Sequence, residues 1–285
     1  MQQNDYQFIH GDILLLDKRP DGDSVRFKPH DPALFKRLDH AGRVKIAKDG
    51  TVQLRLDAID APETHYEGEA QPLGKSIRGA FLKLLGFRNL HLSESGTVQL
   101  ATPPTLPATI LTKMIEVNGR PVSYLFIRPG LSSKQPVNAE LLKQSLNAIM
   151  LQQGLAYPTF YTSTPASHRD VFAQLANDAR TKKRSVWAHD TTASFRLPDQ
   201  ASIGPAGQLI LPKLFRRCTD YLRVKAETPD LTFLQWLTIA TSRGLTEDDA
   251  LWVRGQRTRL SKIIKESDHR LHFQADLLDI VFIEK

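Results

Sequence analysis

The sequence is poor in cysteine, with only Cys218 among its 285 residues. A disulfide or a cysteine-rich zinc site needs more than one thiol, so neither can form within the chain, and no disulfide-linked partner is expected. The sequence also lacks a run of about 18 apolar residues, and its first six residues resemble no secretory signal. We therefore expect a cytoplasmic protein without membrane contact, although export by another route stays open.

The histidines are scattered along the chain. Only His269 and His272 lie close together among the nine histidines, and they have no metal-motif context. The charge balance is more informative, because 38 Lys and Arg residues face 31 Asp and Glu residues and the sequence pI is near 9.5. A basic protein favours a polyanionic partner, and nucleic acid, either DNA or RNA, is the obvious one. The sequence does not indicate an oligomeric state.

The pattern of apolar residues predicts two domains. Short apolar runs separated by Gly, Pro, Asp and Asn extend from residue 6 to about 127, which is typical of antiparallel strands. One helical stretch, residues 69–85, interrupts them. We expect an α+β protein with a five-stranded OB-type barrel in residues 1–190, a linker in residues 191–207, and a mostly helical accessory domain in residues 208–285.

Further helices are predicted by capping signals. Asn138 and Ser167 are placed to cap helices over residues 138–153 and 167–183, and Gly154 can end the first of them. In the C-terminal part, Thr246 and the acidic residues after it predict the start of a helix. The basic residues between 254 and 265 would then share a helix face. An additional segment, residues 28–49, would cover the barrel or bind a ligand.

Acidic residues and an arginine gather in two short segments, Asp21-Gly22-Asp23-Ser24 and the stretch from Arg55 to Glu63. Pro62 biases the backbone before it toward an extended form, which would aim the Ala61 carbonyl outward beside Asp60. Carboxylates and a carbonyl form a hard oxygen site that suits Ca²⁺ or Mg²⁺. Glu63 is the candidate to orient or deprotonate a hydrolytic water.

Hydrolysis of a phosphodiester also needs positive charge on the phosphoryl oxygens. Arginine is suited to this role because its planar guanidinium stays charged and can bind two oxygens. Arg55 is one candidate. Arg120, in the Gly-containing turn Asn118-Gly119-Arg120, is the other.

Four motifs in this order resemble the thermonuclease, or staphylococcal nuclease-like, family over about residues 6–190. They are Asp21-Gly22-Asp23-Ser24, Arg55 to Glu63, Asn118-Gly119-Arg120, and Gly154-Leu155-Ala156. The resemblance implies an OB-fold and a Ca²⁺-dependent endonuclease, with Mg²⁺ as a possible substitute, that leaves 3′-phosphate ends on DNA, RNA or both.

The resemblance also implies a role for each site residue. Asp23 and Asp60 would bind the metal with the Ala61 carbonyl, and Asp21 would support them. Arg55, Glu63 and Arg120 would be catalytic. Aromatic residues after the last motif are candidates to stack on a base: Tyr157, Phe160 and Tyr161.

The competing hypothesis is a barrel of the same kind that binds nucleic acid without cutting it. Modules of that class typically lose the acidic or arginine residues, whereas this sequence retains Asp23, Arg55, Asp60, Glu63 and Arg120. Retained, salt-sensitive binding without cleavage would identify such a module.

Overall fold

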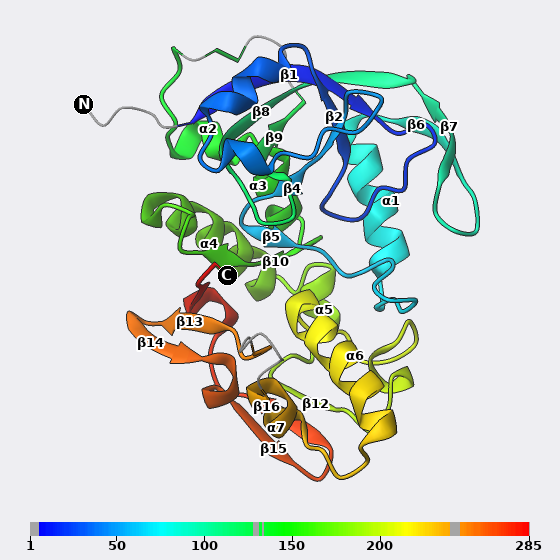
Figure 1. Ribbon diagram of the computed structural model, residues 1–285, viewed down its shortest axis with the longest axis vertical. Coiled ribbons are helices and arrows are strands. Elements are labelled where there is room, and N and C mark those ends of the chain that lie inside the picture. Colours follow the sequence, from blue (N-terminus) through cyan, green and yellow to red (C-terminus); the bar gives the residue numbers. More distant parts are fainter. Residues whose placement is uncertain (1–5, 128–130, 133, 240–245, 285) are drawn as a thin grey trace.

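The structure is a computed structural model that describes residues 6–127, 131–132, 134–239 and 246–284. Its first part is built around a large curved sheet with helices against it, and its last part combines two helices with short strands (Figure 1). Helix α6 has one end near the first part and runs away from it along one side of the C-terminal part. No helix in the described ranges is long and apolar enough to cross a membrane.

The main sheet has six strands in the order β3-β2-β1-β8-β9-β4. Their bounds are β1 Gln7–Leu14, β2 Arg26–Pro29, β3 Val52–Gln53, β4 Arg55–Leu56, β8 Thr105–Ile115 and β9 Pro121–Phe126. Neighbours are antiparallel except β4 and β9, which pair in parallel. The barrel-like character predicted from the short apolar runs is confirmed, whereas the predicted number of five strands is not.

Two smaller strand pairs belong to the same part of the chain. Strand β5, Ile59–Asp60, follows β4 along the chain and pairs with β10, Tyr157–Pro158. Strands β6, Arg88–Leu92, and β7, Val98–Thr102, form a separate hairpin.

Four of the helices of the first part follow the predicted regions with different bounds, and α5 was not predicted. They are α1 Gly74–Leu85, α2 Ala139–Lys143, α3 Leu146–Gln152, α4 Ala166–Thr181 and α5 Val186–His189. Asn138 caps α2 as predicted, because its side chain accepts from the Leu141 amide at 3.0 Å. Ser145 caps α3 in the same way and so divides the predicted 138–153 helix in two. Ser167 is not a cap, because α4 begins one residue before it, after Pro165.

The mostly helical accessory domain predicted for residues 208–285 is wrong. This region contains only two α-helices in its described part, α6 Pro212–Glu227 and α7 Phe233–Thr238. The rest of it is largely short strands: β13 Ala250–Val253, β14 Gln256–Arg259, β15 Ile264–Ser267, β16 Arg270–Phe273 and β17 Ile280–Phe282. The basic residues between 254 and 265 therefore do not share a helix face.

The helix predicted after Thr246 is replaced by strand β13, and the acidic side chains there have other uses. Asp248 accepts hydrogen bonds from the Ser261 amide and hydroxyl, both at 2.8 Å. Asp249 binds Arg217 at 3.1 Å. Along β13, buried Leu251 is followed by exposed Trp252, which is the two-residue period of a strand.

Strand pairing joins the two parts of the chain. Strand β11, Phe160–Tyr161, pairs in parallel with β17, so residues about 120 positions apart share one sheet. Within the predicted linker, β12, Ser194–Arg196, pairs with β16. The segment is therefore structured and contributes to the C-terminal sheet, while the division into domains stays a prediction. Below, "C-terminal part" means residues 191–284.

Candidate functional site

The two acidic segments lie against each other at one end of the barrel. Gly22 permits this approach, because a β-carbon on it would lie 2.7 Å from that of Ala61. Gly74, at the start of α1, does the same from the other side, since a β-carbon there would lie 2.4 Å from the Glu63 carbonyl oxygen. Side chains at these positions would push the Asp60–Glu63 segment out of place. Gly22 and Gly74 therefore allow neighbouring segments to pack closely against the acidic turn.

Asp23 is fixed by the turn that it faces. Its carboxylate accepts a hydrogen bond from the Ala61 amide at 3.0 Å. Burial, with the nearby charges of Asp60 and Asp21, raises the pKa of Asp23 to about 7. Asp21 is tied to the same turn, because it accepts from the Thr64 hydroxyl at 2.9 Å. The structure thus brings together three of the predicted acidic residues.

Glu63 lies at the end of the same turn and is partly buried. Its amide donates to the Gln71 side-chain oxygen at 3.1 Å, and the Gln71 amide group donates to the Ile210 carbonyl at 2.7 Å. Burial raises the pKa of Glu63 to about 8, although the neighbouring Arg216 opposes that rise. Asp57, in contrast, is buried against Thr164 at 2.9 Å and does not belong to this site.

The two predicted arginines are neighbours because β4 and β9 pair in parallel. In that pairing Arg55 lies opposite Val122, and Val122 follows Arg120 by two residues. The Arg55 guanidinium carbon lies 4.4 Å from the centre of the Tyr161 ring, a cation–π contact. Arg120 donates to Glu116 at 2.8 Å across the Gly119 turn. Both arginines are thus oriented by a partner.

Of the three predicted stacking residues, only Tyr161 borders the site. Tyr157 and Phe160 have exposed fractions of 0% and 1%. The Tyr157 hydroxyl donates to Asp190 at 2.9 Å, and its ring contacts Trp187. Neither buried ring can stack on a base in this arrangement, so the prediction for Tyr157 and Phe160 is wrong, because these positions face the interior of the protein.

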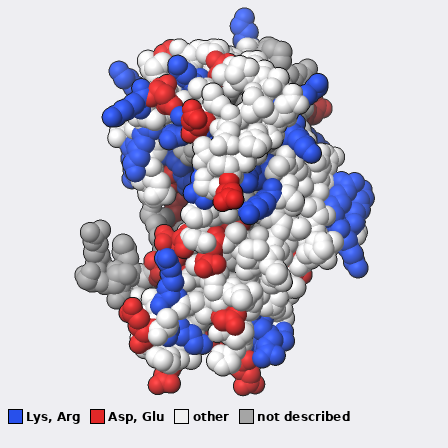
Figure 2. Space-filling view, turned by 90° about the vertical axis from the view of Figure 1, so that its right-hand side faces the viewer, with Lys and Arg blue, Asp and Glu red and all other residues white. Residues whose placement is uncertain are grey.

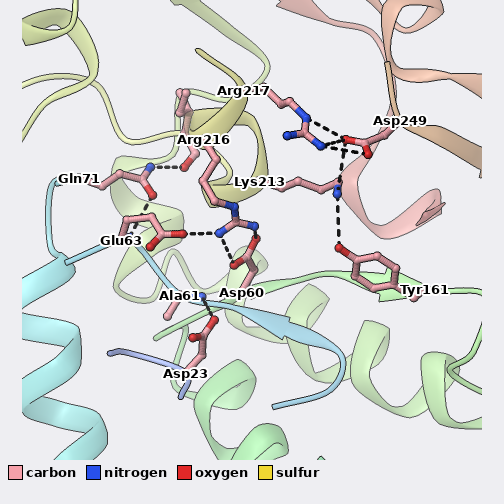
Figure 3. A network of polar contacts seen from close by, with 11 residues as sticks. Asp23, Asp60, Ala61, Glu63, Gln71, Tyr161, Lys213, Arg216, Arg217 and Asp249 are labelled. Carbon is pink, nitrogen blue, oxygen red and sulfur yellow. Dashed lines mark hydrogen bonds and ion pairs between the residues drawn. The ribbon is translucent and has the colours of Figure 1, made fainter. Parts of the chain in front are cut away.

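Sequence reasoning missed a group of cations that α6 brings to the site. Residues 213, 216 and 217 are three and four positions apart and lie on one face of the helix, while Leu214, Phe215 and Cys218 pack into the core. Figure 3 shows Arg216 pointing toward the acidic turn, and Lys213 and Arg217 pointing toward Asp249. The spacing of the basic residues in Lys213-Leu214-Phe215-Arg216-Arg217 indicates a helix with a basic face.

Arg216 joins the C-terminal part to the acidic turn through its guanidinium group. Its two terminal nitrogens donate to both carboxylate oxygens of Asp60, at 3.1 and 2.9 Å. One of them also forms an ion pair with Glu63 (Figure 3). Burial alone would lower the pKa of Arg216, but Asp60 and Glu63 raise it well above its usual value.

The other two cations have partners within the C-terminal part. Arg217 forms ion pairs with Asp249 at 3.1 Å and Glu247 at 2.8 Å. Lys213 lies 3.4 Å from Asp249 and donates to the Tyr161 hydroxyl at 3.3 Å. Lys213 therefore reaches the aromatic ring against which Arg55 lies, whereas Arg217 is directed away from the acidic turn.

A cavity of about 620 Å³ lies between the barrel and the C-terminal part. Predicted site residues that line it are Asp21, Asp23, Arg55, Asp60, Glu63, Arg120 and Tyr161. His40 and Arg43, from the additional 28–49 segment, also line it. That segment is attached to the Arg120 turn, because the Lys45 amide donates to the Gly119 carbonyl at 3.0 Å. The additional segment therefore forms part of the cavity wall.

Outside the cavity, positive charge is not concentrated on the face shown in Figure 2. Lys and Arg side chains are more frequent in the upper half and at the right edge of the described part of that face, and Asp and Glu side chains lie among and below them. The basic excess of the sequence is therefore not evident there as one continuous patch for a polyanion, and the mixed charges of the cavity are the more specific feature.

The residues present do not fit a Ca²⁺ ion in this arrangement. Within the described ranges, no three His, Cys, Asp or Glu side chains are arranged to hold a metal. Both oxygens of Asp60 are bound by Arg216. A divalent ion needs such oxygens as ligands. The ion would also be repelled by the guanidinium, because two like unit charges about 4 Å apart repel each other by roughly 4 kcal/mol at an effective dielectric constant of about 20.

Comparison with known families agrees with the motifs. Residues 53–189 match the family model described as staphylococcal nuclease homologue. This stretch therefore forms a staphylococcal nuclease-like domain, as the resemblance implied, and it contains Arg55, Asp60, Glu63 and Arg120. Asp21 and Asp23 precede the matched residues, and α6 follows them. No curated protein matches the chain.

Proposed function

We propose that the protein is a nuclease that hydrolyses phosphodiester bonds of DNA, RNA or both. The observation that carries this proposal is that one cavity is lined by the acidic pair Asp60 and Glu63, by Asp23, and by both arginines, Arg55 and Arg120. The family match over residues 53–189 suggests nucleic acid as the ligand of this cavity. Acidic and guanidinium groups around one phosphate are the combination that phosphodiester hydrolysis requires.

The proposed roles follow from the positions of the side chains. Arg55 and Arg120 bind the phosphoryl oxygens and stabilise the charge that develops on them. Glu63 accepts a proton from a water molecule in its ionised form, and because burial raises its pKa to about 8, the share of Glu63 able to act as a base increases as the pH rises through that value.

The water oxygen bonds to phosphorus while the bond from phosphorus to the 5′-oxygen breaks. The 5′-oxygen takes up a proton, so one water is consumed and a 3′-phosphate and a 5′-hydroxyl are formed. Ca²⁺, or Mg²⁺ in its place, remains part of the proposal as the cofactor that the resemblance implies.

The test is cleavage of single-stranded DNA, double-stranded DNA and RNA by the full chain, with Ca²⁺, with Mg²⁺ and with a chelator. Glu63→Ala should lower turnover about 10²–10⁴-fold with little loss of binding. Glu67→Ala is the matched control, because Glu67 is an exposed carboxylate paired with Arg223 outside the cavity. Equal rates for the two variants would contradict the role given to Glu63.

A second candidate, a nucleic-acid-binding module that does not cut, is favoured by one observation. The guanidinium of Arg216 occupies Asp60 and Glu63 together, which leaves these carboxylates without freedom to act in this arrangement. Salt-sensitive binding without cleavage under any metal condition would select this candidate over the nuclease.

A further inference from the structure

Arg216 binds the acidic turn in the way that a bound cation would. One guanidinium meets both oxygens of Asp60 and also reaches Glu63. A guanidinium matches a carboxylate in this two-pronged manner and does not lose its charge at any ordinary pH. The positive charge at the acidic turn is therefore supplied by the chain itself.

The position of Arg216 is fixed by contacts on both sides of it in the sequence, one just before α6 and one on α6. Before it, the Ile210 carbonyl accepts from Gln71 at 2.7 Å, and Gln71 also holds the Glu63 amide. After it, Asp220 accepts from the Tyr66 hydroxyl at 2.9 and 3.1 Å. Because these contacts join α6 to the segment around Glu63, they hold the guanidinium against its carboxylates.

A metal ion and this guanidinium need the same oxygen lone pairs. Ca²⁺ binds carboxylate oxygens directly and typically collects six to eight oxygen ligands. The hydrogens of Arg216 point at both oxygens of Asp60, so an ion cannot bind there until those hydrogen bonds break. The repulsion between two cations adds to this requirement.

We propose that Arg216 is an internal cation that closes the site, and that a divalent ion binds Asp60 and Glu63 only when the Arg216 guanidinium leaves them. The inference rests on the proposed function in taking Asp60 as a metal ligand. It goes beyond that function in assigning control of the metal site to a residue of the C-terminal part, outside the matched domain.

The experiment is a calorimetric titration of the full chain with Ca²⁺, using wild type, Arg216→Gln and Arg223→Gln. Arg223 is the matched control, because it lies on the same helix and also forms an ion pair with the barrel part, at Glu67 2.6 Å away, but outside the cavity. Arg216→Gln should bind Ca²⁺ at least about ten-fold more tightly, since breaking even one charge-assisted hydrogen bond weakens the binding of the ion by about that factor. Arg223→Gln should match wild type.

Thermal unfolding gives a second measurement. An ion that binds only the folded state raises the unfolding midpoint, so Ca²⁺ should stabilise Arg216→Gln more than wild type or Arg223→Gln. If Arg216→Gln does not fold without metal, Arg216→Lys takes its place, because an ammonium keeps the charge but cannot bind both Asp60 oxygens as a fork. Equal Ca²⁺ affinity in all variants, or no Ca²⁺ binding in any of them, would overturn the inference.

Cleavage assays on the same proteins separate this inference from the proposed function. Tighter Ca²⁺ binding by Arg216→Gln, without cleavage by any variant, would retain the competition and reject the nuclease. Ca²⁺-dependent cleavage by wild type, with an unchanged Ca²⁺ affinity in Arg216→Gln, would retain the nuclease and reject the competition.

Discussion

The two walls of the cavity are built in different ways. In the barrel wall, Asp23, Asp60 and Glu63 are held by short loops, by backbone amides and by glycines that allow close approach. In the C-terminal wall, one face of α6 supplies the cations, and their position depends on how the helix docks. The barrel wall is therefore fixed by local structure, whereas the C-terminal wall is fixed by contacts over long sequence separations.

This difference matters for function because the walls carry opposite charge at their point of contact. The barrel wall presents carboxylates with raised pKa values, as burial produces for Asp23 and Glu63. Arg216 compensates the charge of the turn from the other wall. Separating the walls would expose the acidic turn to solvent and to ions, whereas the turn itself would keep its shape.

The largest expected effect comes from a fully buried side chain, Tyr157, and is compared with that of Tyr161 at the contact between the walls. Tyr157→Ala should lower the free energy of unfolding by about 3–5 kcal/mol, because it empties a fully buried position and removes the hydrogen bond to Asp190. Tyr161→Ala should cost less, because Tyr161 is only partly buried and borders the cavity. Urea unfolding measures both, and a larger loss for Tyr161→Ala would contradict the comparison.

The next effect concerns the arginines of the barrel wall. Arg55→Ala and Arg120→Ala should each reduce the rate of cleavage about 10²–10³-fold, because each removes a donor that stabilises charge in the transition state. Arg223→Ala, which removes a cation outside the cavity, should leave the rate unchanged. Single-turnover cleavage measures this difference. If Lys213→Ala lowers the rate as much as Arg55→Ala does, the C-terminal wall takes part in the chemistry and the comparison fails.

The same contrast explains what the sequence predicts. The motif residues lie on paired strands and adjoining turns, so their order in the sequence already indicates that Asp60, Glu63, Arg55 and Arg120 face one place. The structure brings them to one cavity, while their catalytic roles stay predictions. The partnership of Arg216 with Asp60 spans 156 positions, and a single sequence carries no signal for a pairing over that separation.

The C-terminal fold was mispredicted for a related reason. Thr246 and the acidic residues after it resemble the start of a helix. In the structure, however, Asp248 binds Ser261 and Asp249 binds Arg217. Tertiary partners override a weak local preference when they satisfy the same side chains better. The short strands β13–β17 also offer few residues each for detecting a two-residue period, so the helical interpretation was favoured.

The smallest expected effect tests how α6 is docked. The Tyr66 hydroxyl donates to both oxygens of Asp220 across the walls, at 3.1 and 2.9 Å. Burial, followed by Asp220 itself, raises the pKa of Tyr66 to about 12, so the hydroxyl remains a donor at neutral pH. Tyr66→Phe should cost about 1–2 kcal/mol and increase hydrogen exchange along α6, because it removes a contact that seats the helix.

Tyr221→Phe is the matched control for this change. Like Tyr66→Phe, it removes a phenolic hydroxyl, here from a residue of α6. The hydrogen bond that is lost, from the Tyr221 hydroxyl to the Leu231 carbonyl at 2.9 Å, lies within the C-terminal part. Both variants should lose stability in urea, yet only Tyr66→Phe should loosen the contact between the walls and so raise Ca²⁺ affinity slightly. If Tyr221→Phe changes Ca²⁺ affinity as much, general loss of stability rather than docking of α6 controls access to the acidic turn.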